Sequence, residues 1–449
     1  MFPDEGRTMS EAEWLERARR HCFLGRLDRR QTEGPVFSHG SGSVVWDVEG
    51  KEYLDFNSGQ MCSALGHNHP RIVRAVAEAL KTMIHANSTY YNVQEVLLAE
   101  RLASTLPPPL SKSFFALSGS DSNEAAIGMA RKVTGRHDIA SPHVSFHGLS
   151  DTPRAVTYAG WRGGISAATP GSYAFIAPYC LRCPIRHEYP GCEIACLDGS
   201  MELLDAETAG GLAAVLTEPL FSAGGVIEPP PGWLTHVARE TRARGALFIL
   251  DEAQTGLAKL GTMWAFEQEG VVPDILTISK HFGGGIAISA VVTSPELEQQ
   301  AIAGGFSYAH SHSNDPLACA AALATLETIE EERLPERALE IGARLRARLE
   351  ELRARHDAVG DVRGRGILQG VELVRADGSP AFELGETLRR ICMREGLIFS
   401  VRRNGSVLRF VPPFSTTEEQ LDRAAEILDL ALTEAQEGAV ARVAGDVRA

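Results

Sequence analysis

Two polar residues end hydrophobic runs in the segment 246–280. Asp251 ends the run ALFILD, Gln254 follows one helical turn later, and Lys280 comes directly after the run ILTIS. Because α/β folds place active sites at the carboxyl ends of parallel strands, these side chains are candidates for chemistry. A lysine amine forms a Schiff base with pyridoxal phosphate, and an aspartate pairs with the protonated ring nitrogen of that cofactor. Taken alone, such residues are more often an exposed aspartate and a solvated lysine.

Small residues join a predicted strand to a predicted helix at 117–124. Ser118, Gly119 and Ser120 let the backbone approach a ligand, and a helix N-terminus offers free N–H groups to a phosphate. An ordinary Ser-Asp N-cap is an equally good interpretation of this run. Further along, Phe146 of the run FHG could lie flat against a cofactor ring, although a core phenylalanine is the simpler interpretation.

Four of the eight cysteines are clustered, with the spacing C-x2-C-x8-C-x3-C. Four thiolates could close a tetrahedral zinc site, whereas packed thiols behave as small hydrophobic groups. The middle spacing is shorter than in common zinc ribbons, which favours packed thiols and leaves metal binding open. The residues concerned are Cys180, Cys183, Cys192 and Cys196.

Length and charge limit the class of protein. At about 150 residues per domain, 449 residues suggest two or three domains. The net charge of −14 disfavours broad binding to nucleic acid or anionic lipid. No apolar run approaches the roughly 18 to 20 residues of a membrane helix, and the acidic N-terminus is unlike a signal peptide. We therefore expect a soluble cytoplasmic protein with small-molecule ligands.

The elements that must position these residues form an alternating pattern. Between about 70 and 330, apolar strands alternate with amphipathic helices, which predicts a mostly parallel sheet with helices on both faces. The predicted strands are 113–117, 213–219, 246–252 and 275–279, and the predicted helices include 122–135 and 233–245.

The two ends of the chain show other patterns. Residues 10–30 predict an amphipathic helix, and 41–56 predict a hairpin that turns at Glu49-Gly50. We expect three regions: an N-terminal helix and hairpin belonging to a small domain (1–59), a large cofactor-binding domain (60–325) and an α+β C-terminal domain (326–449). The last region contains the runs GILQGVELV, LIFSVRR and VLRFVPP and a hairpin at Asp377-Gly378.

In this combination and order, the motifs resemble the class III aminotransferase family of pyridoxal-phosphate enzymes of fold type I. The resemblance extends from Trp46 to about residue 435 and implies a homodimer, or a tetramer of two dimers, with active sites at the subunit interface. The motifs that carry it are Gly66–Pro70, Ser118–Ser120, Phe146–Gly148, Leu250–Gly256 and Ser279–Lys280.

The resemblance also implies roles for individual residues. Lys280 is the Schiff-base lysine, Asp251 the partner of the pyridine nitrogen, and Gln254 a hydrogen-bond donor to the phenolic oxygen. Phe146 stacks on the ring, with His147 beside it. The phosphate is held by Ser118, Gly119 and Ser120 and by Ser311 of the neighbouring subunit.

Within the family, Asp55–Met61 and Leu65–His67 resemble the 2,2-dialkylglycine decarboxylases. Gln60 would hold the substrate carboxylate so that the bond to Cα breaks, and Arg409 would bind the carboxylate of a 2-oxo acid such as pyruvate. The expected reaction converts a 2,2-dialkylglycine, such as 2-aminoisobutyrate, and a 2-oxo acid to a ketone, CO2 and an amino acid. The alternative is a non-decarboxylating aminotransferase of amino acids or ω-amines. A binding or regulatory protein of the same fold would have no need of Lys280.

The chain departs from those decarboxylases at the expected substrate pocket. Phe146 stands where they have Trp, Leu149 where they have Met, and Ser222-Ala223 where they have two serines. The first two changes shrink the side chains and reshape the substrate pocket.

The decarboxylases also imply an alkali-metal site, for which we expect potassium. Oxygen ligands with a single carboxylate suit a monovalent cation, although an Asp before Pro316 is also a common turn residue. The expected ligands are the side chains of Ser88 and Asp315 and the carbonyls of Ala86, Ser311 and Ser313.

Overall fold

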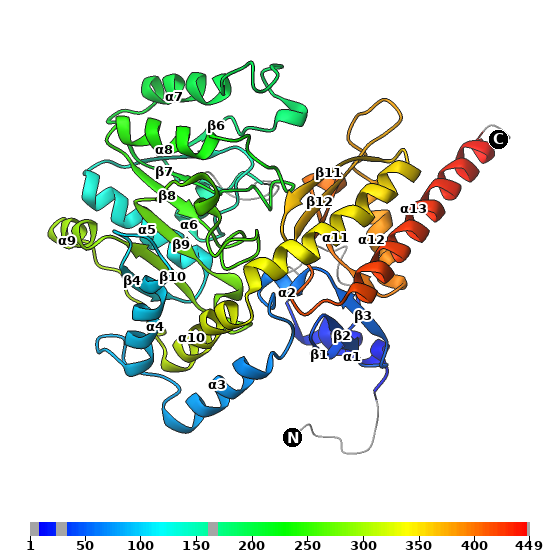
Figure 1. The fold of residues 1–449 in the computed structure, drawn as a ribbon, viewed down its shortest axis with the longest axis horizontal. Coiled ribbons are helices and arrows are strands. Elements are labelled where there is room, and N and C mark those ends of the chain that lie inside the picture. Colours follow the sequence, from blue (N-terminus) through cyan, green and yellow to red (C-terminus); the bar gives the residue numbers. More distant parts are fainter. Residues whose placement is uncertain (1–8, 24–33, 160–168, 447–449) are drawn as a thin grey trace.

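The computed structural model describes residues 9–23, 34–159 and 169–446. Its largest sheet has seven strands in the order β4-β10-β9-β8-β7-β5-β6 (Figure 1). The pairs from β9 to β6 are parallel, whereas β10 is antiparallel to both β9 and β4. The predicted sheet is therefore confirmed as mostly parallel, with one reversed strand. The strands are β4 (Lys112–Ala116), β5 (Asp138–Pro142), β6 (Ser172–Phe175), β7 (Leu212–Thr217), β8 (Leu247–Asp251), β9 (Ile275–Ile278) and β10 (Ser289–Thr293).

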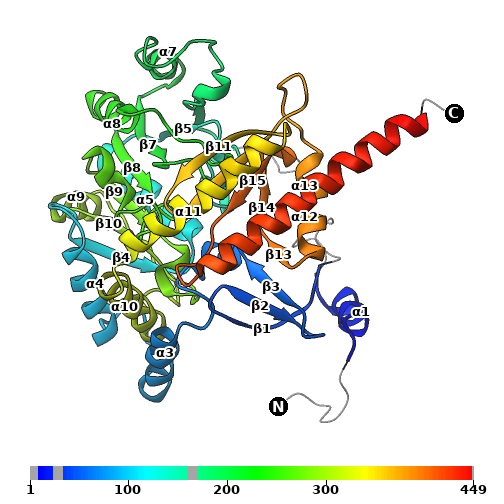
Figure 2. The same ribbon diagram turned by 45° about the vertical axis from the view of Figure 1, so that its right-hand side comes forward.

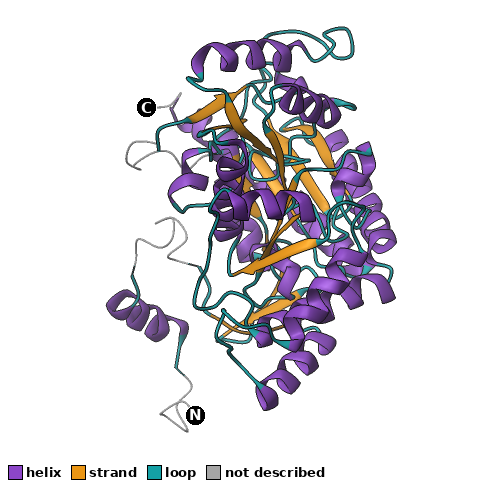
Figure 3. Ribbon diagram, turned by 90° about the vertical axis from the view of Figure 1, so that its left-hand side faces the viewer, coloured by secondary structure: helices purple, strands orange, loops and turns teal. Residues whose placement is uncertain are grey.

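The central strands are buried on both faces, as continuous apolar runs require. Every residue of β7, β9 and β10 is buried. Helices flank the strands on both sides (Figure 3), among them α5 (Gly119–Thr134), which packs on β10, β9 and β7, and α8 (Trp233–Ala243), which packs on β8. The others here are α3 (Pro70–Thr82), α4 (Val93–Ser104), α6 (Asp151–Ala155), α7 (Ala195–Glu207), α9 (Pro295–Ala303) and α10 (Pro316–Glu331).

The N-terminal hairpin shares a sheet with the C-terminal segment (Figure 2). Strands β1 (Phe37–Ser41), β2 (Val44–Asp47) and β3 (Glu52–Asp55) are antiparallel neighbours, and β13 (Leu397–Ile398) adds to β3 in parallel. The predicted N-terminal helix is α1 (Glu11–His21), which begins at a capping box formed by Ser10 and Glu13. The rest of that prediction, from residue 24 on, lies outside the described residues.

The third sheet has four strands, and every neighbouring pair in it is antiparallel. Its order is β11 (Val359–Arg365), β12 (Leu368–Leu373), β15 (Val407–Phe410) and β14 (Ser400–Arg402). Helices α11 (Leu334–Arg355), α12 (Leu384–Arg394) and α13 (Glu418–Asp446) accompany it. The expected boundary at residue 325 falls inside α10. Within the described part of the chain, no helix has the length and apolarity to cross a membrane.

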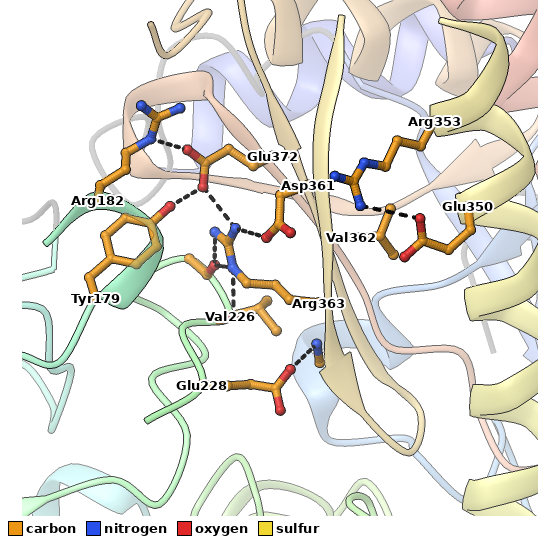
Figure 4. A network of polar contacts seen from close by, with 12 residues as sticks. Tyr179, Arg182, Val226, Glu228, Glu350, Arg353, Asp361, Val362, Arg363 and Glu372 are labelled. Atoms are coloured by element: carbon orange, nitrogen blue, oxygen red, sulfur yellow. Dashed lines mark hydrogen bonds and ion pairs between the residues drawn. The ribbon is translucent and has the colours of Figure 1, made fainter. Parts of the chain in front are cut away.

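A buried network joins this third sheet to the loop after β7 (Figure 4). Arg363 of β11 donates to the carbonyls of Gly225 and Val226 (2.7 and 2.9 Å) and to a carboxylate oxygen of Glu372 (2.8 Å). Glu372 also accepts from Tyr179 and Arg182. Burial alone would raise the pKa of Glu372, but Arg363 and these two donors hold it below its ordinary value. The network fixes the third sheet against the loop that carries Ser222.

Removing Arg363 tests the importance of this joint. We expect Arg363→Met to lower the free energy of unfolding by about 2–3 kcal/mol, because the buried carboxylate of Glu372 loses one of its two cations and keeps only Arg182 and Tyr179 as donors. The half-buried pair of Arg365 and Glu228 offers a matched control, since Arg365→Met should cost about 1 kcal/mol or less. Urea unfolding followed by tryptophan fluorescence measures both, and equal losses would contradict the special role of Arg363.

Candidate active site

Asp251, at the carboxyl end of β8, is a buried carboxylate surrounded by donors. Its Oδ2 accepts from Asn123 Nδ2 (2.8 Å) and lies 2.9 Å from His147 Nδ1, and its Oδ1 accepts from the backbone N–H of Ala253 (3.0 Å). Burial would raise the pKa of Asp251, but these hydrogen bonds and the charge of Lys280 outweigh it and hold the pKa below its ordinary value. The site therefore keeps a negative charge ready for a cationic group.

Two residues of this cluster, Asn123 and Thr277, were not predicted from the sequence. Asn123, in the first turns of α5, holds Asp251 and also accepts from Thr277 Oγ1 (2.8 Å). Thr277 lies on β9 directly opposite Asp251 in the sheet register. Polar residues inside a fully buried strand and a buried helix face are the signals that could have identified them.

Lys280 begins the short 3-10 turn η5 (Lys280–Gly283) directly after β9. Its φ of +57° is left-handed, a conformation that a residue with a side chain adopts only when its surroundings impose it. Burial lowers the pKa of the Lys280 amine, against the opposing charge of Asp251. The amine is therefore more easily deprotonated than a surface lysine, which suits a nucleophile or base.

The start of α5 forms an open anion cradle. The Ser118 hydroxyl caps the helix by accepting from the backbone N–H of Asp121. Among the described residues, no acceptor is found for the backbone N–H groups of Gly119 and Ser120. A Cβ on Gly148 would lie 2.4 Å from Ser120 Oγ. Only glycine therefore lets the backbone at position 148 pass this close to Ser120. Ser120 Oγ accepts from the N–H of Leu149 (3.0 Å) and keeps its own proton to donate.

Arg409 of β15 is a buried guanidinium whose hydrogen-bond partners are all neutral. Its Nη1 donates to Ser222 Oγ (3.1 Å) and to Gln254 Oε1 (2.9 Å), and its Nε donates to Ser400 Oγ (3.0 Å). Burial, reinforced by the positive charge of Arg402, pulls the pKa of Arg409 well below its ordinary value. Three residues predicted from the sequence thus meet, and no carboxylate among the described residues pairs with the arginine. A carboxylate ligand would supply the missing charge.

Phe146 and Leu149 follow β5 on the loop that borders this cradle. Phe146 is half-buried and its backbone N–H donates to Glu218 Oε1 (2.9 Å), whereas Leu149 is exposed. His147, between them, is buried and bridges Asp251 and Ser141.

Gln60 lies in the kinked turn α2 (Ser58–Met61). Gly59 is left-handed (φ +67°) and the Gln60 side chain is exposed. Ser58 Oγ donates to the carbonyl of Val411 (2.6 Å), two residues beyond Arg409. The turn is therefore fastened to the strand that carries the arginine, although none of the hydrogen bonds found joins the Gln60 amide to Arg409.

The expected alkali-metal residues lie on two loops, one after α3 and one before α10, which meet where His85 contacts Asp315. Two histidine side chains take up the oxygens of this carboxylate. His85 Nδ1 and His312 Nδ1 each lie 2.6 Å from a different oxygen of Asp315. Ser313 is buried and its Oγ accepts from the N–H of His310, while Ser311 is exposed. The potassium site stays a prediction, in which the ion would compete with two histidines for Asp315.

The four clustered cysteines line one small cavity between η3 (Cys180–Arg182) and α7. Burial and the neighbouring thiols raise the pKa of Cys196 to about 11, so it carries its proton. Within the described residues, three ligand atoms of metal-binding type come within 4.8 Å of one another at His85, His312 and Asp315, and the cysteines form no such group. This arrangement favours packed thiols.

Comparison with known proteins places these features in context. The sequence profile of the family "Aminotransferase class-III" matches residues 28–432. An uncharacterized aminotransferase of Schizosaccharomyces pombe is 36% identical over 89% of this chain and 90% of its own. A leucine/methionine racemase of Thermococcus litoralis is 34% identical, with 92% and 94% covered. The crystal structure of an (S)-enantioselective ω-transaminase from Thermomicrobium roseum superposes with a TM-score of 0.89 at 31% identity, covering 96% of this chain and all of that one. The expected fold is thereby confirmed.

Proposed function

This chain belongs to the class III aminotransferases, which use pyridoxal phosphate, and we propose that it transfers an amino group between an amino acid or ω-amine and a 2-oxo acid. One observation carries the proposal: Asp251 and Lys280 lie at the ends of the neighbouring strands β8 and β9, and Arg409, which has no carboxylate partner among the described residues, donates to Gln254, three residues after Asp251. The similar aminotransferase and ω-transaminase support plain transamination more than the decarboxylation expected from the sequence.

The residues present fit the cofactor. The free N–H groups of Gly119 and Ser120 and the hydroxyl of Ser120 would hold its phosphate, and the donor-held carboxylate of Asp251 would face its ring nitrogen. Phe146 and Gln254 complete the set that we assign to the ring. The bound cofactor supplies an aldehyde that accepts amino groups and a ring that withdraws electrons.

The chain's own residues account for binding and proton transfer. Arg409 binds the substrate carboxylate through its guanidinium, and the neutral donors and acceptors around it leave its charge available. Lys280 Nζ would take the proton from the substrate Cα and would deliver a proton to the carbon that bears the cofactor's aldehyde group, which completes the transfer of the amino group. Asp251 keeps its negative charge throughout, because three donors hold it.

Replacing Lys280 tests the proposal directly. We expect Lys280→Ala to lower the transamination rate by about 10³-fold or more, because the proton carrier is lost. Borohydride reduction followed by mass spectrometry should attach the cofactor to the Lys280 peptide of the wild type and to no peptide of the variant. Lys112→Ala, at an exposed lysine, serves as the control. Full activity in Lys280→Ala would refute the assignment.

Decarboxylation of 2,2-dialkylglycines is a second candidate, favoured by the place of Gln60. The turn that carries this amide is fastened to the Arg409 strand through Ser58 and Val411. The bond between Cα and the substrate carboxylate would point in one direction when Gln60 binds the carboxylate and in another when Arg409 binds it. The two residues would thus select which bond of Cα breaks.

An assay with two amino donors separates the candidates. With pyruvate as acceptor, an aminotransferase should form alanine from a primary amino acid or amine, whereas a dialkylglycine decarboxylase should release CO2 and acetone from 2-aminoisobutyrate. If both reactions occur, Gln60→Ala should slow CO2 release about tenfold more than transamination, because an amide hydrogen bond to a charged group is lost. Inversion of L-leucine without any 2-oxo acid would contradict both candidates in favour of racemisation.

We also propose a homodimer, because the surface beside the Ser311 loop is apolar. Asn92 Nδ2 donates to the Asn314 carbonyl (2.8 Å), which joins this surface to the loop. Eight exposed apolar side chains on two successive helices and the segment between them are typical of an interface. These side chains, on α3, α4 and the segment between them, are Leu80, Met83, Ile84, Tyr90, Tyr91, Val93, Val96 and Leu97.

Charging this surface should separate the subunits. We expect light scattering to give twice the chain mass for the wild type and the single-chain mass for the double variant Ile84→Asp/Tyr91→Asp, since a buried carboxylate opposes association. Leu203→Asp, at an equally exposed leucine on α7, should leave the mass unchanged. A wild-type monomer, or a double variant that stays dimeric, would contradict the proposal.

A further inference from the structure

Glu218 is a buried glutamate that the proposed reaction leaves without a role. It directly follows β7, one residue before Pro219, and is 2% exposed. Its Oε1 accepts from the N–H of Phe146 (2.9 Å), whereas its Oε2, also buried, has no hydrogen-bond partner among the described residues. No cation lies within ion-pair distance of it there. An ionised carboxylate with one bare, buried oxygen would be costly.

The charged groups that act on Glu218 come from three other elements. Asp251 of β8 repels a negative charge on Glu218, and Lys280 of η5 attracts it. Arg409 of β15 also feels the charge of Glu218. The hydrogen bond from Phe146, together with these charges, puts Glu218 beside the residues assigned to the cofactor and to the substrate carboxylate.

Asp251 and Glu218 compete for one negative charge. Asp251 is held by the two side chains and one backbone N–H described above, whereas Glu218 has the backbone N–H of Phe146 at 2.9 Å and a weaker contribution from the backbone of Ser222, and no side chain donates to it. When two buried carboxyl groups interact, the better-solvated one stays ionised and the other takes the proton. The geometry assigns the charge to Asp251 and the proton to Glu218.

We infer that Glu218 is a neutral carboxylic acid in the resting protein, and that its Oε2–H donates a hydrogen bond into the space served by Lys280 and Arg409. Its proton keeps that space free of a negative charge that would repel a substrate carboxylate. This inference rests on the proposed function, because it assigns Glu218 to the site where the carboxylate binds.

The proton gives the site a dependence on pH. Burial, and next the charge of Asp251, raises the pKa of Glu218 to about 8. Glu218 is neutral below that pH and ionises above it. The new charge would then oppose an anionic substrate and partly cancel the charge of Arg409, so binding of a 2-oxo acid should weaken as the pH rises through 8.

The KM for pyruvate tests this, because pyruvate itself does not titrate between pH 6.5 and 9.5. For the holoenzyme we expect KM to rise about tenfold between pH 7 and pH 9, since about a tenth of a group with a pKa near 8 keeps its proton at pH 9. Glu218→Gln, which imitates the protonated acid, should keep the wild-type KM at pH 7 and lose the rise. Glu218→Ala should raise KM at both pH values, because it loses the donor. A rise that persists unchanged in Glu218→Gln would overturn the inference.

Infrared spectroscopy of the full chain gives a second result that does not depend on activity. A protonated carboxyl group absorbs separately from a carboxylate, and Glu218→Gln should remove the protonated band that titrates near pH 8. Glu252 provides the matched control: burial raises its pKa to about 7, but donors from Ala265, Phe266 and Thr255 hold its oxygens. Glu252→Gln should leave the band near pH 8 in place.

The two measurements separate failure of this inference from failure of the proposed function. If the protein is an active aminotransferase but Glu218→Gln keeps the infrared band, the inference about Glu218 is wrong and the proposed function stands. If the protein has no transaminase activity but the band disappears in Glu218→Gln, Glu218 is a neutral acid and the proposed reaction is wrong.

Discussion

A negative charge can persist inside a protein only where donors replace the water it has lost. At the end of β8 this condition is met by Asn123 of α5, His147 of the loop after β5 and the backbone of Ala253, all directed at Asp251. Thr277 of the neighbouring strand in turn holds Asn123. The register of β8 and β9, the start of α5 and the path of the loop after β5 must all agree for this carboxylate to be stable.

The positive charge of Arg409, in the same site, is stabilised in a different way. Arg409 is as buried as Asp251 but is held by hydroxyl and amide oxygens, which solvate the guanidinium without neutralising it. Since β15 belongs to the third sheet, its position relative to Asp251 depends on the contact between the two halves of the molecule. Arg363 and Glu372 supply that contact, because they join the third sheet to the loop of Ser222.

Sequence reasoning located the residues whose signals are local. Asp251 and Lys280 stand out because each ends an apolar run, and α5 because it begins at a capping box. Glu218 ends a strand in the same way, yet its significance depends on Asp251, to which it is joined only in space. The partnership of Asn123 with Asp251 links residues 128 positions apart. No periodicity encodes such a pair, and the contact of His85 with Asp315, 230 positions away, was missed for the same reason.

The parallel pairing of β3 with β13 has a consequence for how the chain is made. Asp55 pairs with Ile398, so the N-terminal hairpin gains its last neighbour only after most of the chain has been synthesised. At translation rates of about 5–20 residues per second, that interval lasts roughly 17–70 s. During that time an open strand edge of the nascent protein is exposed on the ribosome, where it could pair with other chains. In the finished protein β13 covers that edge at Leu54 and Asp55.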